Sequence, residues 1–169
     1  MEQGATSFRD EIAHPRLAAL YDYWHARRGP NGAMLRADLE PLDIPKLLAC
    51  LILSDVWENG HHIRYRLVGS EIAAAHGFDY TGKTIEELTS GTTLDFTREL
   101  YAKIVTGGVP VFSEGHFRWE GKEHRWTKRL HLPLSRDGSA IDMVLAGQVF
   151  EQKRPDGVER LLVADPATL

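Results

Sequence analysis

The chain has 169 residues, a single cysteine and a formal net charge of −4 at pH 7. Its length fits one domain with a tail, and its acidic balance argues against a sequence-independent nucleic-acid binder, which needs a basic surface. The lone Cys50 excludes an internal disulfide. Because the N-terminus lacks the features of a signal peptide and no apolar run approaches the roughly eighteen residues of a membrane span, we expect a cytoplasmic protein without membrane insertion.

Residues 14–29 are predicted to form an amphipathic helix, because four large apolar side chains recur at spacings of three and four. These side chains are Leu17, Leu20, Tyr21 and Trp24. We expect the helix to cover part of the core as an N-terminal cap. The alternative is that the same side chains also contact a signalling partner or a second copy of the chain.

A hairpin follows, with Asn59-Gly60 as its turn. With this loop the predicted cross-strand pairs are Val56 with Ile63, Asp55 with Arg64, Ser54 with Tyr65 and Ile52 with Leu67. Helical segments are then expected at 71–76, at a capping box formed by Thr84 and Glu87, and at 94–105.

Residues 109–150 are predicted to form three antiparallel strands, with turns at 120–122 and at Asp137-Gly138. A two-residue loop at Asp137-Gly138 pairs Leu134 with Ile141, Leu132 with Met143, Leu130 with Leu145 and Trp126 with Val149. Phe117 and Trp119 fall on this apolar face, which we predict to be the core. The opposite face is predicted to point outward and carries Glu114, His116, Arg118, Arg125, Arg129 and His131.

Lys128 is the one charged residue on the predicted inner face, between Gly115 and Gly147 of the neighbouring strands. Burying a lysine without a partner costs folding free energy, so we consider three arrangements of the Lys128 side chain. Its ammonium group reaches solvent, pairs with an acidic side chain, or meets an anionic ligand.

No catalytic or metal-binding group is predicted. Eight histidines are present, but no three converge in the expected strands. A glycine-flanked serine nucleophile is missing from the sequence, and Gly82-Lys83-Thr84 lacks the upstream glycine of a phosphate-binding loop.

The order of elements predicts an α+β domain, because two strands, a group of helices and three further strands do not alternate as in a doubly wound fold. We divide the chain into an N-terminal cap helix and linker (1–35), a domain (36–150) and a C-terminal tail (151–169).

The chain resembles the PAS superfamily over about residues 17–150. The matching segments are Ile63–Ser70, Ile72–Phe78 and Gly82–Leu88, together with the last hairpin at Asp137-Gly138. Arg36–Pro41 and Ile44–Leu48, followed by Tyr65–Gly69, look like a group of short, stand-alone bacterial PAS-like proteins. The asparagine that usually ends the second strand is replaced here by Gly69 or its neighbour.

This resemblance implies a five-stranded antiparallel sheet with helices on one face, and a role in sensing, signalling or protein interaction rather than catalysis. It does not supply a cofactor. Relatives that form a flavin photo-adduct need a cysteine between the hairpins, whereas Cys50 precedes the first strand. The best-known haem-binding relatives carry a histidine on the long helix, and residues 94–105 contain none.

We therefore expect a cytoplasmic regulatory module that binds a small molecule, a signalling protein, or both. The alternatives are a ligand-free interaction or dimerisation module and, last, a small α+β enzyme. The pocket candidates are Tyr65, Leu67, Tyr101, Phe117, Trp126, Lys128, Leu130, Met143 and Leu145. The partner-binding candidates are Leu17, Leu20, Tyr21, Trp24 and Phe150, and Val144 and Ala146 share the outward face with Phe150.

Overall fold

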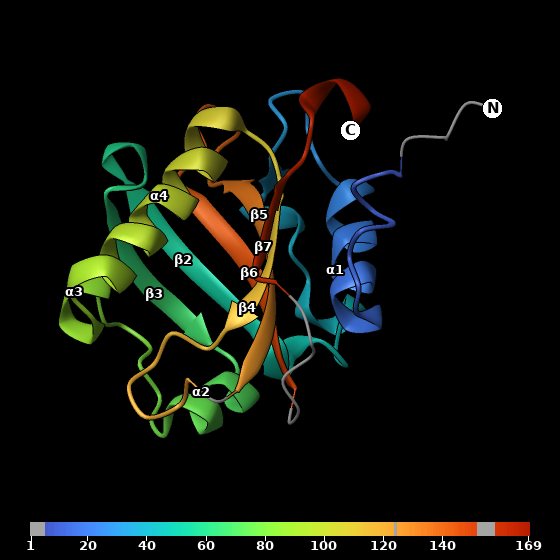
Figure 1. Ribbon diagram of the computed structural model, residues 1–169. Coiled ribbons are helices and arrows are strands. Elements are labelled where there is room, and N and C mark those ends of the chain that lie inside the picture. Colours follow the sequence, from blue (N-terminus) through green and yellow to red (C-terminus); the bar gives the residue numbers. More distant parts are fainter. Residues whose placement is uncertain (1–5, 124, 152–157) are drawn as a thin grey trace.

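The computed structural model describes residues 6–123, 125–151 and 158–169 (Figure 1). Its strands are β1 (Met34–Leu35), β2 (Leu51–Trp57), β3 (His62–Val68), β4 (Val111–His116), β5 (Trp126–Ser135), β6 (Met143–Glu151) and β7 (Arg160–Val163). Its helices are α1 (Pro15–His25), α2 (Ser70–His76), α3 (Ile85–Leu88) and α4 (Gly91–Gly107). Short 3-10 turns lie at Arg36–Asp38, Pro41–Asp43, Leu48–Cys50, Glu58–Gly60 and Pro166–Thr168.

All seven strands belong to one sheet, in the order β3-β2-β6-β5-β4-β7, with β1 beside β5. Every pairing is antiparallel except that of β1 with β5. The predicted α+β class is confirmed, and β1 and β7 add two strands to the five that were expected. Within the described residues, no helix combines the length and the apolar character needed to cross a bilayer.

The sheet is covered on both faces. Figure 1 shows α1 on one side and α3 and α4 on the other, with α2 near one end of the strands. One core cluster lies between α1 and the sheet, and a second lies between the sheet and α2–α4. The expected helix at 94–105 is longer than predicted, and the capping box of Thr84 and Glu87 is formed.

The β2–β3 hairpin has the predicted register near its turn, where Val56 pairs with Ile63 and Ser54 with Tyr65. A bulge between Leu53 and Ser54 then shifts the register, so Leu67 pairs with Leu53 and not with Ile52. One extra residue in a strand turns the following side chains to the other face. Leu67 is consequently 47% exposed, and its predicted place in a pocket is wrong.

The β5–β6 hairpin has a longer loop than predicted. Leu134 pairs with Met143 and Leu130 with Gly147, a shift of two residues from the predicted partners. The backbone N–H of Arg136 donates to the Asp142 carboxylate at 2.8 Å, which closes the wider loop. A shift of two leaves the side chains of β5 and β6 on the same faces relative to each other as predicted.

Helix α1 packs closely on the sheet, with the side chains of Leu17 and Leu20 over Gly147. The indole N–H of Trp24 donates to the Pro133 carbonyl at 2.9 Å, in a buried contact with β5. The apolar face of α1, including Tyr21, is therefore buried inside the chain. The cap helix is confirmed. The alternative that these side chains contact a partner is wrong for this arrangement, because the chain's own sheet encloses them.

Residues assigned to the C-terminal tail supply the edge strand β7, which pairs with β4. Arg160 of β7 forms ion pairs with Glu114 at 2.8 Å and with Glu11 at 2.9 Å, so it joins this strand to the segment before α1. The division into cap, domain and tail stays a prediction.

Replacing Gly147 with alanine should destabilise the fold. The added Cβ would lie 2.7 Å from Leu20 Cδ2 and 2.8 Å from Leu17 Cδ2, closer than carbon atoms approach. Overpacking of this kind costs about 1–3 kcal/mol, which urea unfolding would measure. The control is Gly107→Ala at the exposed end of α4, where alanine favours the helix. Equal stability of the two variants would contradict the close packing.

Candidate functional site

The sheet face under α2–α4 lines a cavity of about 110 Å³. The polar or charged side chains of the sheet and helices that line it include Tyr65, Tyr101, Arg129, His131 and Gln148. Tyr80, from the segment between α2 and α3, completes this polar group. A concave space with a few convergent polar groups is the usual form of a small-molecule site.

Strand alternation brings the β5 residues to this cavity. Arg129 and His131 are two residues apart, so both point to the α4 side, together with Thr127. The predicted outward orientation of Arg129 and His131 is wrong, because the face we took for solvent-exposed is covered by helices.

Several polar groups of the lining already have partners in the chain. The hydroxyls of Ser54 and Tyr101 are 3.2 Å apart, and the Gln148 amide donates to the Thr127 hydroxyl at 3.1 Å. The hydroxyls of Tyr65 and Tyr80, in contrast, form no hydrogen bond with the described part of the chain. Their rings meet edge to face, with centroids 4.9 Å apart. The two hydroxyls remain available to a molecule in the cavity.

Arg129 is a half-buried cation with few contacts. Its Nη2 donates to the carbonyl of His116 at 3.3 Å, and no carboxylate of the described residues lies within ion-pair distance. Burial lowers the pKa of Arg129 to about 10, and the neighbouring Arg118 lowers it in the same direction. The group therefore still carries its charge at pH 7.

His131 is 5% exposed and packs against Tyr101, with ring centroids 5.5 Å apart. Its Nδ1 has no hydrogen-bond partner among the described residues. Burial, and secondarily the charge of Arg129, lowers the pKa of His131 to about 3. A neutral imidazole thus sits beside a charged guanidinium.

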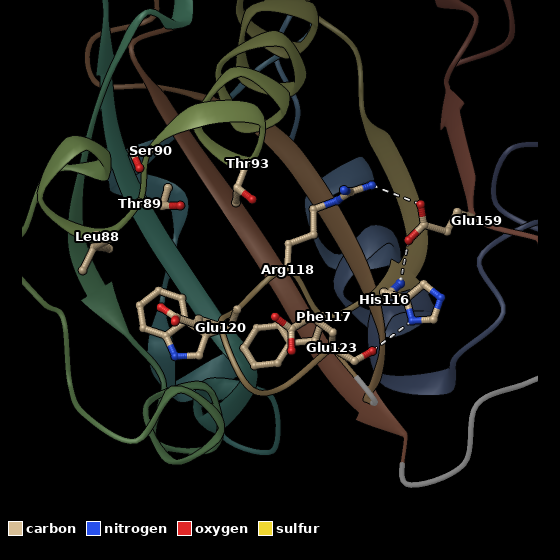
Figure 2. A pocket seen from close by; sticks show the side chains of 11 residues that line it. Leu88, Thr89, Ser90, Thr93, His116, Phe117, Arg118, Glu120, Glu123 and Glu159 are labelled. Carbon is tan, nitrogen blue, oxygen red and sulfur yellow. Dashed lines mark hydrogen bonds and ion pairs between the residues drawn. The ribbon is translucent and has the colours of Figure 1, made fainter.

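A wider pocket of about 790 Å³ lies outside the cavity and shares Thr93, Phe117 and Arg118 with it (Figure 2). Figure 2 shows Arg118 extending toward Glu159, and their ion pair measures 3.1 Å. The Glu159 carboxylate also accepts the backbone N–H of His116 at 2.9 Å. The outer pocket therefore has an acidic side that the inner cavity lacks.

An aromatic cluster borders the cavity where it meets the outer pocket. The ring of His76 lies 4.8 Å from that of Phe117 and 4.6 Å from that of Trp119. Tyr80 contacts the same histidine at 4.8 Å. Burial lowers the pKa of His76, and its Nδ1 is 2.9 Å from the carbonyl of Ile72. These contacts hold the β4–β5 loop against α2.

The structure divides the pocket candidates between the two faces. Tyr65, Tyr101 and Phe117 line the cavity. Phe117 was predicted on the opposite face, with Trp126 and Leu130, and that placement is wrong because β4 pairs with β5 one residue away from the predicted register. The others share the face under α1, and they are Trp126, Lys128, Leu130, Met143 and Leu145. Their assignment to a pocket is wrong, because the more apolar face is the one that α1 fills. Among the partner candidates of the opposite face, Phe150 packs against Phe117, while Val144 and Ala146 are buried.

Lys128 pairs with an acidic side chain, one of the three explanations considered. Its Nζ is 2.6 Å from Glu151 Oε1 and donates to the carbonyl of Ala13 at 3.2 Å. Its strand partners are Glu114 and Val149, not the two glycines that were predicted. Lys128 therefore holds the segment before α1 to the sheet, and the ligand explanation is wrong.

Sequence reasoning missed the central residues of the site. Arg129, His131 and Gln148 follow the period of a strand, but their polarity indicated solvent. The helices α2–α4 were predicted, and placing them on this face would have shown that these polar groups are buried.

Residues 12–147 match the family model PAS_5, described as a PAS domain. The match covers most of the chain, and the chain belongs to the PAS domain family. A search of curated proteins finds no match. Within the described residues, no group of three or more histidine, cysteine or acidic side chains is arranged to hold a metal ion.

His131 should make the fold sensitive to acid. Its pKa is about 3 in the folded chain and about 6.5 when unfolded, so between these values the unfolded state binds more protons. The free energy of unfolding should thus fall as the pH drops below 6.5, by up to about 1.4 kcal/mol per pH unit from this group.

Urea unfolding between pH 7.5 and 4.5 measures this slope. His131→Gln should lose the part of the pH dependence that comes from this histidine. Tyr101→Phe changes the neighbouring ring and keeps the histidine, so it should retain the full pH dependence. Identical slopes for wild type and His131→Gln would show that His131 titrates normally.

Proposed function

We propose that this PAS domain is a sensory module that binds a small molecule in the cavity between the sheet and α4. A sensory or regulatory role in signalling follows from the family. The observation that supports a ligand is the polar lining, in which Arg129, Tyr65 and Tyr80 face one space with most of their hydrogen-bonding capacity unused.

The position of the cavity supports a route for the signal. Its wall includes α4, through Thr97 and Tyr101, and the β4–β5 loop, through Phe117 and Trp119. A ligand that contacts both elements changes the contacts between them, and the Arg118 guanidinium, 4.3 Å from the centre of the Phe96 ring, couples the loop to α4 directly. Binding is thereby passed to the outer surface of α4.

The cavity as it stands favours a compact ligand. At about 110 Å³ it is smaller than the roughly 150 Å³ cavity that holds a benzene molecule. A multi-ring cofactor such as a flavin or a haem would require the helices to move away from the sheet.

A protein partner is the second part of the proposal. Trp57 and Leu67 are 42% and 47% exposed on β2 and β3, at the edge of the sheet away from β7. Exposed large apolar side chains of this kind favour a docking site for a cytoplasmic signalling protein. They equally suit a ligand-free interaction module, which is the alternative function.

Native mass spectrometry of the protein purified from its own host, followed by the denatured spectrum, tests for a retained small molecule. Thr93→Trp should abolish retention, because Thr93 lines both the cavity and the outer pocket and a tryptophan there blocks the passage. Thr92→Trp is the matched control, since Thr92 is exposed and lines neither.

Loss of the molecule in Thr93→Trp alone would support the proposed site. A wild-type protein that releases no small molecule would contradict the proposed ligand binding and favour the ligand-free interaction module.

A further inference from the structure

We propose that the molecule sensed carries a small oxyanion, a carboxylate or a phosphate, which the Arg129 guanidinium binds inside the cavity. This inference rests on the proposed function and names the chemical class of its ligand. It follows from the unused donors, the charge distribution and the size of the cavity.

Arg129 has hydrogen-bond donors that no described residue uses. A guanidinium has five N–H donors in a planar fork, and Arg129 uses one of its nitrogens for the His116 carbonyl at 3.3 Å. The remaining donors have no partner in the described part of the chain. Because a half-buried cation without an ion-pair partner is only partly solvated, such a group favours an anion within reach. A carboxylate or phosphate fits the fork with two parallel hydrogen bonds.

The charged residues around the cavity also favour an anionic ligand. Its lining contains two arginines, Arg118 and Arg129, and no acidic residue. Glu159 neutralises Arg118 on the outer side, and the other acidic side chains of the outer pocket are Glu120 and Glu123. The inner space therefore contains the charge of Arg129, which forms no ion pair with a described residue and is only partly offset by the more distant Glu159.

Neutral groups complete the set of donors. Burial raises the pKa values of Tyr65 and Tyr80, so their hydroxyls stay protonated and can donate to an oxyanion. Tyr101 is engaged with Ser54. The Nδ1 of His131, 5% exposed and without a partner among the described residues, is an independent polar group of the lining that remains unsatisfied.

The volume limits the bound group. A water molecule occupies about 30 Å³ of liquid, so about 110 Å³ accommodates an anionic group of about four non-hydrogen atoms. A longer molecule would extend past Phe117 into the outer pocket, which shares that residue. A short carboxylic acid or a phosphate group matches both the size and the donors.

Titration of the full-length protein with inorganic phosphate, acetate, pyruvate and succinate, followed by calorimetry and Trp fluorescence, tests the inference. Acetamide and succinamide are the uncharged controls. At least one of the four anions should bind, and neither acetamide nor succinamide should bind. Arg129→Met should weaken that binding by tenfold or more, since the variant loses the charge-assisted hydrogen bonds of the guanidinium.

Arg129→Lys keeps the charge without the fork, so it should weaken binding less than Arg129→Met and guards against a variant that does not fold. Arg125→Met is the matched control, because Arg125 lies over Phe150 and does not line the cavity. The tightest member of the panel distinguishes a carboxylate from a phosphate ligand.

The outcomes separate this inference from the proposed function. Suppose that the wild type retains a neutral molecule, which Thr93→Trp loses and Arg129→Met still retains. This result would overturn the proposal of an anionic ligand and leave the proposed sensory site intact. Absence of any bound molecule, together with no binding from the panel, would overturn both.

Discussion

The packing of α1 on one face of the sheet is the constraint on which the rest of the structure depends. Gly147 gives the Leu17 and Leu20 side chains room to approach the backbone, and Trp24 fixes the helix to β5 through the Pro133 carbonyl. This contact buries the more apolar face of β5 and β6. The main apolar core is thus completed on the α1 side, and the other face is able to carry polar groups.

That second face contains groups that an ordinary core excludes. Burial of Arg129 and of the neutral His131 costs stability, and no carboxylate of the described residues forms an ion pair with Arg129. Strained or unsatisfied groups in a folded protein tend to mark functional sites. This polar lining is the observation on which the proposed ligand rests.

The chain also separates its charges in space. Lys128 and Glu114, on the α1 side of the sheet, form ion pairs with Glu151 and Arg160 that hold the ends of the fold together. On the other side, Glu159 forms an ion pair with Arg118, whereas Arg129 forms none with a described residue. Ion pairs of the first kind are structural, whereas an isolated cation beside protonated tyrosines is suited to recognition.

The sequence by itself determined the α+β class, the amphipathic α1, the β2–β3 turn and the alternation along β5, because these depend on local period and turn chemistry. The β5–β6 loop was predicted too short, but the side chains of these two strands still lie on the same faces relative to each other as predicted, since the register is shifted by two residues. Only the tertiary structure decided which face holds the cavity. Strand alternation separates Arg129 from Lys128 but does not say what covers each side, and helices distant in sequence cover both.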